Sequence, residues 1–145
     1  MADLIIASDS PALRSGVGSV LDPAVTVREA TSAREVLAMV TERAPDLVVA
    51  DLQMGSMGGI ATCRELRLEE SGGRLPRIGV LLLLDRRPDV FLARRSGAEG
   101  WVVKPLDPLR LRRAVDAVLA GGTFFDPSYL PAGLTATRAG AEAVG

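Results

Sequence analysis

The sequence predicts one α/β domain with a parallel, doubly wound sheet, and three observations support this fold class. Short apolar runs alternate five times with stretches that have the apolar spacing of amphipathic helices. The third run, DLVVA at residues 46–50, stays apolar after its first residue, as strands do when helices cover both faces of a sheet. The length of 145 residues suits a single domain. This alternation implies parallel strands joined by right-handed helical crossovers.

Capping and breaking residues set the limits of the expected helices. Ser10 and Pro11 open the first helix, because serine caps a helix and proline suits the first helical position. Ser32 and Glu35 form a capping-box pattern at the second helix, and Gly97 ends the fourth. The strands are expected at residues 4–7, 25–30, 46–50, 78–84 and 100–103, and the helices at 11–21, 33–40, 60–70, 89–96 and 108–119.

Composition excludes several classes of function. The chain has no histidine, so catalysis, metal ligation and phosphohistidine formation by that residue are excluded. The net charge of −1 gives no reason to expect a nucleic-acid or membrane partner. Cys63 is the single cysteine and cannot form an internal disulfide, which favours a reducing compartment. With neither a signal peptide nor a long apolar stretch, the protein is expected in the cytoplasm.

Three charged residues stand at the carboxyl ends of three expected strands. Asp9 follows the first strand, Asp51 the third and Lys104 the fifth. Carboxyl ends of parallel strands share one edge, so we expect these side chains in one crevice. Paired carboxylates suit a hard cation such as Mg²⁺, and a carboxylate oxygen can attack phosphorus to give an aspartyl-phosphate. The metal and the lysine would then neutralise charge on the phosphoryl oxygens.

Each of these residues also has a simpler interpretation. Asp9 could serve only as a helix-capping carboxylate, and Asp51 could simply accept backbone N–H groups at a strand end. Lys104 could be a solvated surface lysine. Against this, it is the only lysine among 17 basic residues, which suggests a specific reason for its position.

The ordered set of Asp9, the segment PDLVVADLQM and the segment GAEGWVVKP resembles the response-regulator receiver family of two-component signalling. The resemblance covers about residues 3–122. It implies a flavodoxin-like (βα)5 sandwich with a five-stranded parallel sheet of order 2-1-3-4-5, the strands being numbered along the chain. It also implies phosphorelay signal transduction in a bacterial cell and a sensor histidine kinase or other phosphodonor as partner.

The resemblance assigns roles to individual residues. Asp51 is the implied phosphoacceptor, and Lys104 is expected to contact the phosphoryl group or its carboxylate. Asp9, Asp51 and the backbone carbonyl of Gln53 are the implied Mg²⁺ ligands. The Lys104–Pro105 peptide bond is a candidate for the cis form.

The chain departs from the family pattern at several positions. Ser8 replaces the first of two adjacent acids, which lowers the expected affinity for Mg²⁺. The family usually has serine or threonine at the end of the fourth strand. Counting back from Lys104 places that switch position at Leu82, to within one residue, and its neighbours are also leucines. Trp101 occupies the place of the aromatic switch residue. We therefore expect an atypical receiver whose switch is partly missing.

The sequence predicts a receiver domain at residues 1–122 and a mostly disordered tail at 123–145, with no effector domain. The stretch GGTFFDPSYL resembles a linker found in one transcription-factor branch of the family, and Phe124, Phe125 and Tyr129 could pack back on the domain. A stand-alone regulator is thus expected, with no direct DNA binding and no membrane contact.

The last two helices and the last strand form a candidate interaction face. It carries Arg94, Arg95, Arg110 and Arg113, which could bind a second copy of the chain or an acidic protein target. A plain solvated helix surface is the simpler interpretation.

Two other classes of function remain as alternatives. A phosphorylation-independent pseudo-receiver would act as a protein-interaction module. Enzymes and flavin carriers are disfavoured. Aspartate-nucleophile phosphatases usually have a second aspartate where this chain has Gln53, and a flavin carrier would not place an anion such as Asp9 in its phosphate loop. We expect no enzymatic activity beyond the domain's own phosphorylation and dephosphorylation.

Overall fold

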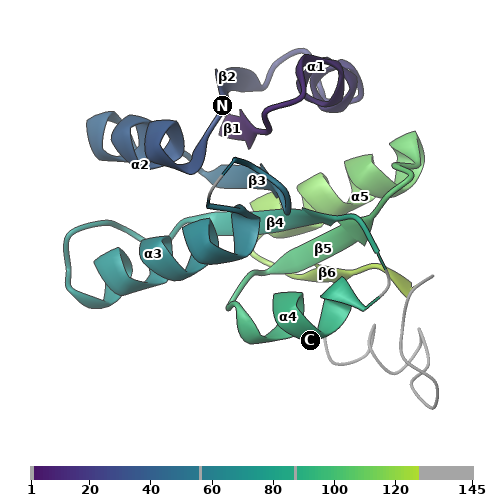
Figure 1. Cartoon of the computed structure of the whole chain (residues 1–145). Helices are drawn as coiled ribbons and strands as arrows, with labels where there is room; N and C mark the ends of the chain where they lie inside the picture. Colours follow the sequence, from purple (N-terminus) through teal and green to yellow (C-terminus); the bar gives the residue numbers. More distant parts are fainter. Residues whose placement is uncertain (1, 56, 87, 128–145) are drawn as a thin grey trace.

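The computed structural model describes residues 2–55, 57–86 and 88–127, which form a parallel sheet with helices on both faces (Figure 1). The sheet order is β2-β1-β3-β4-β5-β6, and every neighbouring pair is parallel. The predicted fold class and the order of the first five strands are confirmed. β6 is an addition to the predicted sheet.

The elements follow the predicted alternation, with limits shifted by at most a few residues. The strands are β1 (Asp3–Ala7), β2 (Thr26–Ala30), β3 (Leu47–Asp51), β4 (Gly79–Leu84), β5 (Gly100–Val103) and β6 (Phe124–Phe125). The helices are α1 (Pro11–Ser19), α2 (Ala33–Glu42), α3 (Gly59–Ser71), α4 (Asp89–Arg95) and α5 (Pro108–Leu119). Within the described ranges, no helix is both long enough and apolar enough to cross a bilayer.

The sheet separates two apolar clusters, because successive side chains of a strand point to opposite faces. Ile5 packs with residues of α2, α3 and α4, whereas its neighbour Ile6 packs with residues of α1 and α5. The leucine run of β4 alternates in the same way: Leu82 and Leu84 face the first cluster, and Leu81 and Leu83 face the second. Burial on both faces explains why this strand is apolar throughout.

Side chains cap the helices largely as predicted. Ser10 Oγ accepts a hydrogen bond from Leu13 N at 3.2 Å, and Ser32 Oγ accepts one from Glu35 N at 3.2 Å. The Glu35 carboxylate accepts a hydrogen bond from Thr31 N at 2.6 Å, one residue before the cap. The capping box is therefore displaced by one residue from its usual form.

The sheet extends beyond the boundary expected at residue 122. β6 pairs with β5 in parallel, with Phe124 beside Gly100 and Phe125 beside Trp101. Asp126 is fully buried, and its Oδ2 accepts a hydrogen bond from Val103 N at 3.0 Å. The first residues of the expected tail thus belong to the fold. The rest of that tail, from residue 128 and including Tyr129, lies outside the described residues.

Candidate functional site

Asp51 ends β3 in the middle of the sheet and is the centre of the candidate site. β1 lies on one side of it and β4 on the other, and the residue is only 4% exposed. Both carboxylate oxygens have a hydrogen-bond donor. Ser8 Oγ donates to Oδ2 at 2.8 Å, and Lys104 Nζ donates to Oδ1 at 2.7 Å. Asp51 is therefore held by one neutral and one charged side chain rather than by backbone N–H groups alone.

Lys104 joins two carboxylates. Its Nζ also donates to Asp85 Oδ1 at 2.7 Å, and Asp85 is the first residue after β4. A hydrogen bond from Lys104 N to Leu84 O, at 2.8 Å, holds the ends of β4 and β5 together. Burial of the ammonium opposes its charge, but the hydrogen bonds and charges of Asp51 and Asp85 outweigh it and raise the pKa of Lys104. The lysine is thus firmly cationic and is not merely solvated.

Asp9 lies on the loop after β1 and is exposed. Its Oδ2 accepts a hydrogen bond from Gly55 N at 3.3 Å, in the loop that follows β3. The helix-capping interpretation of Asp9 is wrong, because Ser10 is the residue that caps α1. Gln53 is also exposed and lies in the same loop as Gly55. The structure thus places Asp9 and the Gln53 segment on the loops that border Asp51.

The oxygen ligands that these loops offer are of the type that a hard cation binds. Asp9, Asp51 and the carbonyl of Gln53 offer oxygen atoms, which are the ligands that Mg²⁺ prefers. Ser8 contributes a neutral hydroxyl, already bound to Asp51 Oδ2, where a third carboxylate would strengthen the set. Among the described residues, no group of three or more acidic, histidine or cysteine side chains is arranged to hold a metal ion. The residues present are therefore suited to Mg²⁺, but only two of the ligands, Asp9 and Asp51, are charged.

The switch residues lie on the next two strands of the sheet, Leu82 on β4 and Trp101 on β5. Leu82 is fully buried beside Ala50 and Trp101, and β4 continues for two residues beyond it. The strand therefore ends at Leu84 rather than at Leu82, and neither side chain has a hydroxyl. Trp101 is 2% exposed and packs on Phe125, with ring centroids 4.5 Å apart and an interplanar angle of 36°. The aromatic switch position is thus covered by the chain's own β6.

The four arginines of the expected interaction face differ in their exposure. Arg94, Arg95 and Arg113 are exposed on α4 and α5. Arg110 is half-buried, and its Nε lies 3.7 Å from Asp126 Oδ1, so it serves the fold as well. Exposed apolar side chains lie on the same helices: Phe91 (56%), Leu92 (54%) and Leu109 (59%).

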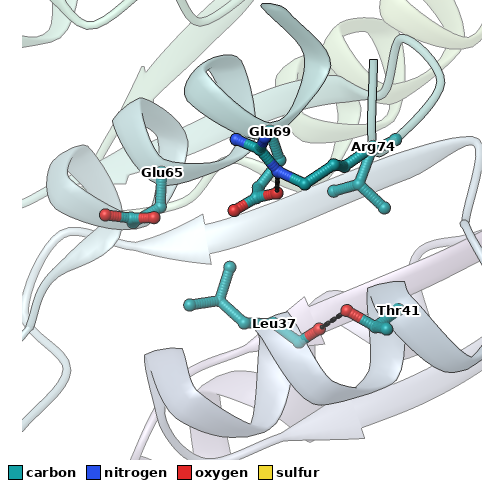
Figure 2. A pocket seen from close by; sticks show the side chains of 6 residues that line it. Leu37, Thr41, Glu65, Glu69 and Arg74 are labelled. Atoms are coloured by element: carbon teal, nitrogen blue, oxygen red, sulfur yellow. Dashed lines mark hydrogen bonds and ion pairs between the residues drawn. The ribbon is translucent and has the colours of Figure 1, made fainter. Parts of the chain in front are cut away.

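Two hollows in the described part of the chain bear on the site and its surroundings. One of about 440 Å³ lies between α1 and the start of α5, and Lys104 and Pro105 form part of its wall. The Lys104–Pro105 peptide bond is cis. The other, of about 240 Å³, lies between α2 and α3 (Figure 2). There Thr41 donates to the Leu37 carbonyl, and Arg74 pairs with Glu69. No residue of this second hollow belongs to the Asp51 site.

Sequence reasoning missed two contacts of the site. Asp85 was not predicted to belong to it, although it follows an expected strand on the same edge as Asp51 and Lys104. Applying the strand-end rule to β4 would have found it. Ser8 was expected only as a lost charge, whereas its hydroxyl contacts the central carboxylate.

Fold and site together define a doubly wound α/β signalling domain of the receiver class. The chain belongs to the response regulator receiver domain family, whose model matches residues 4–116. It is 31% identical to the nitrate/nitrite response regulator protein NarL of Escherichia coli (strain K12), over 97% of this chain and 67% of that protein. It is 28% identical to protein PilH of Pseudomonas aeruginosa, over 83% of this chain and 100% of that protein.

A solved structure is similar along the whole chain. The two-component response regulator of the LuxR family from Aurantimonas sp. has a TM-score of 0.78 and 28% identity, covering 100% of this chain and 99% of that one. The chain spans about two thirds of the length of NarL. Receiver domains are generally signalling modules rather than enzymes. They accept a phosphoryl group from histidine kinases or other phosphodonors on an aspartate, at a site that generally binds Mg²⁺.

Proposed function

We propose that this chain is an atypical receiver that accepts a phosphoryl group on Asp51. The observation that carries the proposal is the buried Asp51 carboxylate, with Lys104 Nζ 2.7 Å from its Oδ1 at the carboxyl edge of the sheet. A carboxylate in this position is a nucleophile, and the adjacent ammonium can neutralise charge on a transferring phosphoryl group.

In this reaction an Asp51 oxygen attacks the phosphorus atom of the donor. The bond from phosphorus to the donor's leaving group breaks, the leaving group departs with the electron pair, and Asp51 becomes an acyl phosphate. The attacking carboxylate oxygen must first give up the hydrogen bond that it accepts in the unphosphorylated protein. Oδ2 is the easier of the two to free, because its partner, the Ser8 hydroxyl, is neutral whereas Oδ1 faces an ammonium.

The residues that would hold Mg²⁺ are Asp9, Asp51 and the Gln53 carbonyl. When bound, the ion would neutralise negative charge on the phosphoryl oxygens. Asp9 already faces the loop after β3 through Gly55, which supports its placement in the set. With Ser8 in place of a further acid, we expect binding to require a higher concentration of Mg²⁺ than a site with three carboxylates would.

The switch is the atypical part of the proposal. The last four residues of β4 are all leucines, so no hydroxyl from this strand can follow the phosphoryl group. Trp101 is stacked against Phe125 and is therefore less free to rearrange. Phosphorylation is thus expected to produce a smaller conformational change than it does when a hydroxyl couples the site to the aromatic residue.

The test is phosphorylation by a small phosphodonor in the presence of Mg²⁺, read by intact mass. The wild-type protein should gain one phosphoryl group, and Asp51→Asn should gain none. Asp116→Asn is the matched control, because it removes the same charge from an exposed position on α5. If the wild-type mass stays unchanged, or if Asp51→Asn is modified equally, the proposal fails.

A second candidate is a pseudo-receiver that binds partners without phosphorylation. One observation favours it: Ser8, Asp51, Lys104 and Asp85 form a connected hydrogen-bonded chain that satisfies both Asp51 oxygens without a phosphate or a metal. This candidate predicts that Asp51→Asn keeps full activity in the cell that uses the protein. Loss of that activity would argue against it.

We also propose that α4, β5 and α5 form the docking face for a second copy or an acidic protein target. Exposed arginines and exposed apolar side chains lie on the same two helices, a mixture typical of interfaces. Light scattering should detect association that is lost in the double variant Arg94→Glu and Arg113→Glu. The matched control is Arg34→Glu, on the exposed side of α2. Equal behaviour of both variants would remove this face from consideration.

A further inference from the structure

The contact between Lys104 and Asp85 gives the site a feature that phosphoryl acceptance does not require. Lys104 Nζ lies 2.7 Å from Asp51 Oδ1 and 2.7 Å from Asp85 Oδ1. The side chains of Lys104 and Asp85 are 26% and 28% exposed, so solvent screens this pair less than a surface pair. One ammonium thus serves two carboxylates in the resting protein.

We infer that Asp85 is an anion gate: its carboxylate holds the position beside Lys104 that an oxygen of an incoming phosphoryl group would take. This inference rests on the proposed function of the Asp51 site and adds a residue that limits its rate. A phosphoryl group reaching Asp51 must share Lys104 with Asp85 or displace it. Either way the entering anion meets a fixed negative charge.

The backbone keeps the gate in place. Asp85 directly follows Leu84, whose carbonyl accepts the hydrogen bond from Lys104 N at 2.8 Å. The Asp85 carboxylate therefore cannot move far from Lys104 without disturbing the end of β4. Rotation of the Asp85 or the Lys104 side chain is the motion that would separate the two charges.

The Asp85 carboxylate is also incompletely satisfied. Its Oδ2 is buried and makes no hydrogen bond within the described part of the chain. A buried carboxylate oxygen without a donor is costly, so Lys104 is the main partner that stabilises this side chain. Removing the negative charge while keeping the shape, as Asp85→Asn does, should leave the fold intact and free the ammonium for an external anion.

The first experiment measures anion binding without any phosphorylation. Because Lys104 is the only lysine, protein whose lysine carries a nitrogen isotope at Nζ gives one ammonium resonance, and it comes from this site. Inorganic phosphate is added to the wild type, Asp85→Asn, Asp85→Glu and the control Asp116→Asn. Coulomb repulsion at this range predicts that Asp85→Asn binds phosphate at least about tenfold more tightly than the wild type. Asp85→Glu, which keeps the charge, and Asp116→Asn should stay within about twofold of the wild type.

The second experiment measures the rate of phosphorylation by a small phosphodonor with Mg²⁺ in the same proteins. Asp85→Asn should react at least about tenfold faster than the wild type, and the difference should shrink as salt is added. A purely structural role for Asp85 would not produce a salt-dependent difference. Far-UV circular dichroism and unfolding in urea show that each variant is folded.

The outcomes separate the gate from the proposed function. Tighter phosphate binding and faster phosphorylation in Asp85→Asn would support both. Tighter binding with no phosphate on Asp51 in any variant would support the gate and refute phosphoryl acceptance. Equal phosphate affinity in Asp85→Asn and the wild type would overturn the gate, whether or not Asp51 is modified. Where Asp51 is phosphorylated, equal and measurable rates in Asp85→Asn and the wild type would overturn it as well.

Discussion

Replacing Gly100 by alanine should detach β6 from the sheet. A Cβ atom at this position would lie 2.4 Å from the Phe124 carbonyl oxygen and 3.1 Å from Phe124 N. Both atoms belong to the backbone, so the clash cannot be relieved by rotating a side chain. The clash is removed most simply if residues 123–126 move away from β5.

The cost follows from the contacts that hold β6. At least three hydrogen bonds are at risk, among them Phe124 N to Glu99 O, Asp126 N to Trp101 O, and Val103 N to Asp126 Oδ2. At about 1 kcal/mol each they contribute about 3 kcal/mol, and the ring contact of Trp101 with Phe125 adds about 1 kcal/mol. The released segment regains conformational entropy, so we expect a net loss of about 2 kcal/mol in unfolding free energy.

Urea unfolding followed by tryptophan fluorescence checks this magnitude. Trp101 is the only tryptophan, so its emission should also shift to the red in the folded Gly100→Ala protein as its ring loses its cover. Gly16→Ala is the matched control, because nothing lies within 4 Å of its added Cβ and alanine favours a helix by about 1 kcal/mol. An unchanged unfolding midpoint and an unchanged emission spectrum in Gly100→Ala would refute the reasoning.

Four more predictions concern the interior and the site. Gly59→Ala should reduce phosphorylation of Asp51 measured by intact mass, because the added Cβ would lie 2.7 Å from Asp51 O; wild-type yield would contradict this. Leu82→Ala should lower the unfolding free energy in urea by about 2–5 kcal/mol, since its side chain is fully buried; a change below about 1 kcal/mol would show that the site collapses to fill the space. Burial raises the pKa of the Cys63 thiol, so alkylation at pH 7 should require unfolding, and rapid labelling of the native protein would contradict this. Because burial raises the pKa of the Cys63 thiol in the folded state, its contribution to the unfolding free energy is fully present below the pKa of the unfolded thiol, and urea unfolding should show it being lost as pH rises from there through the folded-state pKa.

The alternation of strands and helices could be predicted because burial imposes it on the sequence. β3 up to Ala50 and the whole of β4 are apolar since both of their faces are covered, and α5 shows the helical spacing of a helix with one buried face. β6 could not be predicted as a strand. Its two residues have no periodicity, and its position depends on tertiary contacts of Asp126 with β5.

The site was predictable to the extent that it depends on topology. Asp51 and Lys104 meet because both residues end strands of one parallel sheet, and the cis Lys104–Pro105 bond that the resemblance implied is present. The end of β4 agrees with the strand expected at 78–84, but counting back from Lys104 placed the switch position at Leu82, inside the leucine run rather than at its end. The pairing of Leu84 O with Lys104 N fixes that end two residues beyond Leu82.

The two edges of the sheet are poorly suited to pairing with a strand of another molecule. At one edge, β2 presents Arg28 and Glu29, and charged side chains discourage the addition of a foreign strand. At the other edge, β6 has only two residues, too few to act as a template for a growing ladder. Because β5 is covered by this short strand, its longer row of backbone groups is not offered to a neighbouring molecule. In the described part of the chain, contacts between copies would therefore depend on side chains of the helices rather than on fibril-like strand pairing.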